Sequence, residues 1–153
     1  MINLNGNSSS SRQVTFITHP SIQSKAFASY LSETLMAPVV LQNINKPLAQ
    51  RLAKDSVILF DIAVSNKKLN GVWRDIIRLQ ADNPRLLIIN SAQKYELYEM
   101  AQWPALYGVF RHDDDESRLI EGVKAVLNGE QTAELSVKNR TQAVSWANEH
   151  LRH

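Results

Sequence analysis

Short hydrophobic runs rich in β-branched residues alternate along the chain with longer stretches that have helical spacing. The runs predict five strands, at residues 14–18, 39–41, 57–61, 85–90 and 106–110. The stretches between and after them predict helices, at residues 20–35, 47–53, 69–81, 95–100 and 113–128. The run that ends at Asp61 is apolar up to that residue, which is typical of a strand covered on both faces of a parallel sheet.

This alternation predicts an α/β fold of the flavodoxin-like, doubly wound type, a five-stranded parallel sheet with helices on both faces. We expect residues 13–129 to form this domain and the polar residues 1–12 to be a disordered leader. Residues 130–137 show no clear hydrophobic periodicity, and we predict that they form a linker. Residues 138–153 predict a further, C-terminal helix outside the α/β repeat. Its apolar stripe consists of Ala143, Val144, Trp146 and Leu151.

Composition narrows the function classes only slightly. The 153 residues suffice for one domain, and a net charge of +2 does not favour a surface that coats nucleic acid. The chain has no cysteine, which excludes a disulfide framework, a thiolate metal site and a cysteine nucleophile. It has neither a secretory signal nor an apolar run of about 18 residues, so we expect a cytoplasmic protein without a membrane partner.

Polar residues gather where the predicted strands end, the edge at which ligands bind in such sheets. These residues are Thr18, His19, Asp61, Asn90, Ser91, Arg111 and His112. Their layout resembles that of a response-regulator receiver domain over residues 13–128. The resemblance implies that Asp61 is the phosphoacceptor and Ser91 the switch hydroxyl.

Two departures from the receiver pattern weaken this implication. Thr18 and His19 stand where the family has an acidic pair, and Arg111 lies near the place of its lysine. Mg²⁺ prefers several oxygen ligands, and Asp61 is the only carboxylate among these strand-end residues. We therefore expect the site to bind neither Mg²⁺ nor another metal. We interpret Asp61 as a hydrogen-bonded strand end, and a phosphorylatable receiver that uses Asp61 is the alternative. Arg111 either pairs with Asp61 or is solvated, and Ser91 is a switch or a turn residue.

A closer resemblance rests on longer strings. Trp103-Pro104, the run at 108–110, the acidic helix start and the stop at 128–130 are similar to the CsgD type, the curli and biofilm branch of LuxR-family transcriptional regulators. Residues 137–148 resemble the last helix of the LuxR-type helix-turn-helix domain. The resemblance implies a transcriptional regulator with a receiver-like domain.

The same resemblance shows what is missing. In the family a complete DNA-binding domain lies between the receiver and that last helix, but here only residues 131–136 separate them. Six residues cannot form a recognition helix with its scaffold, so we expect a deletion at 130–137 and no autonomous DNA binding. Relatives that bind cyclic di-GMP use a Trp-centred motif ending in arginine just after the receiver. This motif is absent, and we expect no cofactor.

The sequence therefore predicts a binding protein without catalytic residues. We expect a homodimer, or a heterodimer with a full-length regulator, with Ala143, Val144, Trp146 and Leu151 as the packing face. Promoter DNA would be bound only through an intact helix-turn-helix domain. An unrelated flavodoxin-like enzyme or cofactor binder is a further alternative, and the lack of acid/base pairs and glycine-rich loops is evidence against it.

Overall fold

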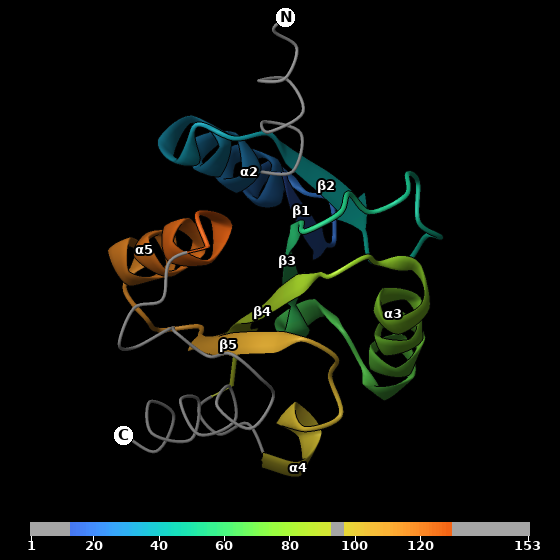
Figure 1. Cartoon of the computed structure of the whole chain (residues 1–153). Coiled ribbons are helices and arrows are strands. Elements are labelled where there is room, and N and C mark those ends of the chain that lie inside the picture. Colours follow the sequence, from blue (N-terminus) through green and yellow to red (C-terminus); the bar gives the residue numbers. More distant parts are fainter. Residues whose placement is uncertain (1–12, 93–96, 130–153) are drawn as a thin grey trace, which may run out of the picture.

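A computed structural model of the chain describes residues 13–92 and 97–129 (Figure 1). Five strands form one sheet in the order β2-β1-β3-β4-β5, and every neighbouring pair is parallel. The strands are β1 (Val14–Thr18), β2 (Val39–Asn43), β3 (Val57–Asp61), β4 (Arg85–Ser91) and β5 (Leu106–Arg111). This arrangement confirms the predicted flavodoxin-like fold.

Helices cover both faces of the sheet. They are α2 (Ile22–Leu35), α3 (Lys67–Gln80), α4 (Leu97–Met100) and α5 (Glu116–Leu127), with a 3₁₀ turn, η1 (Ile62–Val64), after β3. In Figure 1, α2 and α5 lie together on one side of the sheet and α3 lies on the other. This distribution follows from right-handed crossovers between parallel strands.

Helix α2 begins later than the sequence predicted. The N-cap is Ser21, whose hydroxyl accepts a hydrogen bond of 3.0 Å from the backbone N–H of Ser24. The Ser24 hydroxyl in turn accepts one of 2.8 Å from the backbone N–H of Ser21, which completes a capping box. Pro20 therefore precedes the helix, and its expected place in the first helical turn was wrong.

The helix expected at residues 47–53 is absent, because the buried side chain of Gln42 binds the backbone of this segment. Its Nε2 donates to the carbonyls of Asn43, Lys46 and Pro47 at 3.0, 3.3 and 3.1 Å. Its Oε1 accepts from the backbone N–H of Ala49 at 3.0 Å. The Asn43 carbonyl also accepts from the backbone N–H of Lys46 at 3.1 Å. The segment runs from β2 to β3 as a loop.

This loop belongs to the core. Ile44 and Leu52 are 1% and 5% exposed, and the indole N–H of Trp73 donates a hydrogen bond of 2.9 Å to the Ile44 carbonyl. Trp73 thereby ties α3 to the loop after β2. Trp73 itself is a core residue, 1% exposed.

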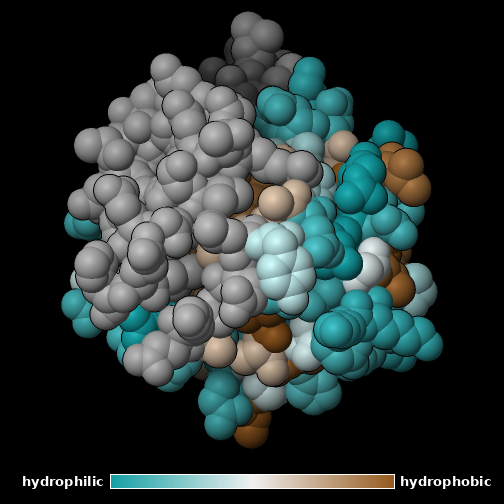
Figure 2. All heavy atoms as spheres, turned by 90° about the horizontal axis from the view of Figure 1, so that it is seen from below, coloured by the Kyte–Doolittle hydropathy of each residue, from teal (hydrophilic) through white to brown (hydrophobic). Residues whose placement is uncertain are grey.

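Exposed hydrophobic side chains are dispersed over the surface. The most exposed are Met36, Ile22 and Leu79, at 90%, 86% and 79%, on separate parts of the fold. On the coloured part of the face in Figure 2, hydrophobic residues lie as separate spots among hydrophilic ones. Single exposed residues of this kind are usual in folded proteins. The described surface thus does not identify a dimer face.

Several predictions lie outside the described residues. They are the leader at 1–12, the linker at 130–137 and the helix at 138–153 with Ala143, Val144, Trp146 and Leu151. Within the described ranges, no helix is long and apolar enough to cross a membrane.

Candidate functional site

Three neighbouring strands end at one edge of the sheet, and polar side chains lie at each end. Because the strands are parallel, the last residue of β1, Thr18, lies beside the last residue of β3, Asp61. Asp61 in turn pairs with Ile89 of β4, so that Asn90 lies one position beyond it. The sheet topology therefore brings together residues that are 43 and 29 positions apart in the sequence.

Asp61 is a buried carboxylate, 7% exposed, with three neutral hydrogen-bond donors. Its Oδ2 accepts from the Thr18 hydroxyl at 2.7 Å. Its Oδ1 accepts from the Asn90 side-chain amide at 3.1 Å and from the backbone N–H of Ala63 at 3.2 Å. A carboxylate has about four lone-pair sites, so three are filled and one on Oδ2 remains. Asp61 is thus a hydrogen-bonded strand end whose donors are two side chains and one backbone N–H.

Asn90 reaches Asp61 through an irregularity in β4. The register between β4 and β5 shifts between Ile88 and Ser91, and Asn90 has a φ of 60°. Asparagine is among the few residues that adopt this left-handed conformation readily. The sequence placed Asn90 at the strand end without identifying it as the partner of Asp61. An asparagine at the end of a strand is the signal that could have suggested the bulge.

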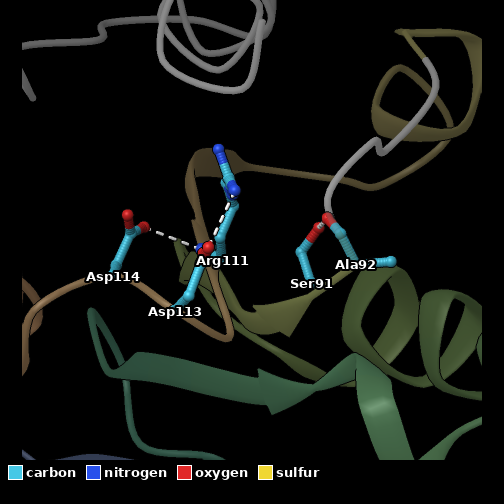
Figure 3. Close-up of polar contacts among 5 residues, drawn as sticks. All are labelled: Ser91, Ala92, Arg111, Asp113 and Asp114. Atoms are coloured by element: carbon cyan, nitrogen blue, oxygen red, sulfur yellow. Dashed lines mark hydrogen bonds and ion pairs between the residues drawn. The ribbon is translucent and has the colours of Figure 1, made fainter. Parts of the chain in front are cut away.

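Ser91 is fully buried at the end of β4, and its hydroxyl donates a hydrogen bond of 2.8 Å to the carbonyl of Ala92 (Figure 3). Its own carbonyl accepts from the backbone N–H of His112 at 3.0 Å. In Figure 3 the Ser91 side chain is turned toward Ala92. These bonds give Ser91 a local role at the end of the strand.

Arg111 pairs with an acidic residue of its own loop. Its Nη2 lies 2.9 Å from Asp113 Oδ2, and its backbone N–H donates to Asp114 Oδ2 at 2.7 Å (Figure 3). The Arg111 side chain is only 12% exposed, and its Nε is buried without a hydrogen-bond partner among the described residues. The sequence left two interpretations open, that Arg111 pairs with Asp61 or that it is a solvated surface residue. Neither holds, because Arg111 pairs with Asp113 and its side chain is largely buried.

A cavity of about 330 Å³ opens beside Asp61, between the strand ends and helices α2 and α5. Its polar lining residues are Thr18, His19, Ser21, Gln23, Ser24, Asp61 and Asn90. Its apolar wall includes Leu119 of α5 and the rings of Phe16 and Phe27, which meet edge to face at 5.8 Å. The cavity is thus amphipathic, with one carboxylate in its wall.

The donor set of this site does not fit Mg²⁺. Magnesium takes six oxygen ligands in proteins, commonly one or two carboxylates together with waters and substrate phosphates. Thr18 lies where the receiver family has an acidic pair, and its hydroxyl donates a hydrogen bond to Asp61. The exposed His19 could provide only a nitrogen ligand, not a carboxylate oxygen. Across residues 13–92 and 97–129, no group of three or more histidine, aspartate or glutamate residues could hold a metal ion.

Comparison with known proteins agrees with the fold. A sequence family described as VpsT-like, receiver domain, matches residues 16–133. The CsgBAC operon transcriptional regulatory protein of Escherichia coli (strain K12) is 32% identical over 114 residues, covering 74% of this chain and 52% of that protein. The probable csgAB operon transcriptional regulatory protein of Salmonella typhimurium (strain LT2) is 29% identical over 123 residues, covering 80% of this chain and 56% of that protein.

A solved structure is also similar to this chain. The crystal structure of the master biofilm regulator CsgD regulatory domain superposes with a TM-score of 0.72 and 29% sequence identity. The match covers 77% of this chain and 89% of that one. The chain spans about half the length of the curated relatives it matches.

Proposed function

The chain belongs to the VpsT-like receiver-domain family, and we propose that it is the regulatory domain of a CsgD-like transcriptional regulator of curli and biofilm genes. The family membership confirms the resemblance to receiver domains and to CsgD-type regulators. The names of the two curated relatives support the proposed process, since both denote regulators of csg operons. The relatives are transcriptional regulators, and we assign this chain no enzymatic reaction.

We propose that this domain acts through protein contacts and not through aspartyl phosphorylation. One observation carries the proposal: the Asp61 carboxylate is held by three neutral donors, and it is the only carboxylate among the described residues that line the cavity. Phosphoryl transfer places charge on the equatorial oxygens, which Mg²⁺ and a nearby cation normally stabilise. Arg111, the nearest counterpart of the family's lysine, is paired with Asp113. Asp61 then serves to join β1, β3 and β4 at their carboxyl ends.

The test of this proposal is the mass of the intact protein after incubation with acetyl phosphate and MgCl₂. We expect no added phosphate on the full chain. A phosphate that appears on the wild type and is lost in Asp61→Ala would contradict the proposal and favour a phosphorylatable receiver.

The proposed partner is a second copy of the chain or a full-length regulator, in the cytoplasm. Sedimentation at tens of micromolar protein tests self-association, and a monomer alone would contradict the homodimer.

We also propose that this chain does not bind promoter DNA by itself, because residues 131–136 are too few for a recognition helix. Specific, salt-resistant retention of a curli-type promoter in a gel-shift experiment would contradict this.

A further inference from the structure

The buried charge of Asp61 has no cationic partner in the described part of the chain. The ion pairs there join Arg78 to Asp75 and Arg111 to Asp113. The three donors to Asp61 are a hydroxyl, a side-chain amide and a backbone N–H, all of them neutral. A buried carboxylate is costly unless a cation or several hydrogen bonds compensate it. A positively charged group that reached Asp61 from the cavity would therefore be stabilised.

The hydrogen-bond acceptors among the polar lining residues suit an ammonium group. One lone-pair site of Asp61 Oδ2 remains open, by the same count of about four sites per carboxylate. Thr18 donates its only hydroxyl proton to Asp61, so its Oγ1 lone pairs are left to accept. A primary ammonium offers three N–H donors and needs only one carboxylate to balance its charge. Mg²⁺ requires more anionic oxygen ligands than this wall provides.

The apolar lining residues of the cavity suit an apolar body. These residues are Phe16, Phe27 and Leu119, and their side chains can remove the apolar surface of a ligand from water. A volume of about 330 Å³ is at the lower end of the range of about 300 to 1,000 Å³ seen for ligand pockets. Size, charge and wall chemistry thus agree on a small amphipathic cation.

We propose that this cavity binds a small primary ammonium compound with a compact apolar or aromatic body, as a regulatory ligand of the domain. The proposal rests on the proposed function, since it takes Asp61 as a carboxylate that is not phosphorylated. The ammonium group binds Asp61 and Thr18, and the body lies against Phe16, Phe27 and Leu119. Because the ligand contacts strand ends as well as α2 and α5, its binding stabilises the folded domain.

The experiment is a titration of the ¹⁵N-labelled full chain with phenethylammonium chloride, followed through the amide signals of Thr18, Asp61, Ala63 and Asn90. Phenethyl alcohol and 3-phenylpropanoate are the matched neutral and anionic probes. We expect saturable shifts with the ammonium probe and binding weaker by about tenfold or more with the other two, because each lacks the ion pair. Absence of saturable shifts with the ammonium probe, or equal binding of the alcohol, would overturn the proposal.

Variants locate the site. Asp61→Asn keeps the shape of the side chain and is expected to weaken ammonium binding by about tenfold or more. Asp75→Asn removes an exposed carboxylate on α3 and is expected to leave the affinity unchanged. Leu119→Trp leaves Asp61 intact, fills the apolar wall and is expected to abolish binding, even if Asp61→Asn fails to fold. Unchanged affinity in Leu119→Trp would place the ammonium compound elsewhere and overturn the proposal.

A parallel titration with MgCl₂ separates this inference from the proposed function. Displacement of the ammonium probe by Mg²⁺ at constant ionic strength would overturn the assignment to an organic cation. If the ammonium probe does not bind and acetyl phosphate does not phosphorylate the protein, this inference is contradicted and the proposed function is not. Uptake of phosphate at Asp61 would contradict the proposed function itself.

Discussion

The side-chain amide of Asn90 donates a hydrogen bond of 3.1 Å to the carboxylate of Asp61 and so joins the ends of two central strands. The bond exists because Asn90 has a φ of 60° at a register shift in β4. Thr18 completes the arrangement from β1, with a hydrogen bond of 2.7 Å. These two side-chain hydrogen bonds join the ends of β1, β3 and β4 at Asp61.

Two substitutions of Asn90 measure separately how its hydrogen bond and its left-handed backbone conformation contribute to stability. Asn90→Ala loses the bond to Asp61 and places a side chain with no local hydrogen bond in the left-handed region. We expect a loss of about 2–3 kcal/mol in the free energy of unfolding, measured by urea denaturation. Asn90→Gly loses only the hydrogen bond and should be more stable than Asn90→Ala by about 1 kcal/mol. Equal stability of the two variants would contradict the role of φ.

Gln42→Glu tests the loop that replaces the expected helix. The substituted carboxylate cannot donate to the carbonyls of Asn43, Lys46 and Pro47 and would lie against them. We expect a destabilisation of about 2–3 kcal/mol and faster amide hydrogen exchange in residues 44–52. The matched control is Gln80→Glu at the exposed end of α3, which should stay within about 0.5 kcal/mol of the wild type. A Gln42→Glu protein as stable as this control would argue against a stabilising role of the Gln42 hydrogen bonds.

Trp73→Phe isolates the hydrogen bond between α3 and the loop. The phenyl ring keeps much of the packing but loses the indole N–H that donates to the Ile44 carbonyl at 2.9 Å. Because the carbonyl is left buried, and the smaller ring leaves a gap, we expect a loss of about 2 kcal/mol in urea denaturation. The control is Tyr98→Phe, since the side chain of Tyr98 is 65% exposed. A loss no greater than in the control would show that the indole bond is dispensable.

Thr18→Asp restores a second carboxylate beside Asp61. Without metal the two negative charges repel, so we expect a melting temperature below that of the wild type. MgCl₂ at constant ionic strength should raise the melting temperature of the variant by several degrees, since about 1 kcal/mol corresponds to roughly 4 °C for a domain of this size. Thr18→Asn is the neutral control and should not respond to Mg²⁺. A comparable response of the wild type would mean that the present donor set already holds the metal.

The local pattern of the sequence was sufficient for the strands. The unbroken run that ends at Asp61 became the central strand β3, with all five of its residues buried. Such runs predict strands because burial on both faces of a parallel sheet favours apolar β-branched residues along the whole segment. The same reasoning failed for residues 47–53. Their helical spacing was real, but the side chain of Gln42 binds the backbone groups that a helix would need.

The partners at the candidate site were decided by the tertiary structure. The sequence by itself determined that Thr18, Asp61, Asn90 and Arg111 lie at one edge of a parallel sheet, because strand ends follow from local hydrophobic periodicity. It could not determine that Asn90 reaches Asp61 or that Arg111 pairs with Asp113. Those choices depend on a bulge, a backbone torsion and the path of a loop. Hydrogen bonds and ion pairs require distances of about 3 Å, which only the assembled fold defines.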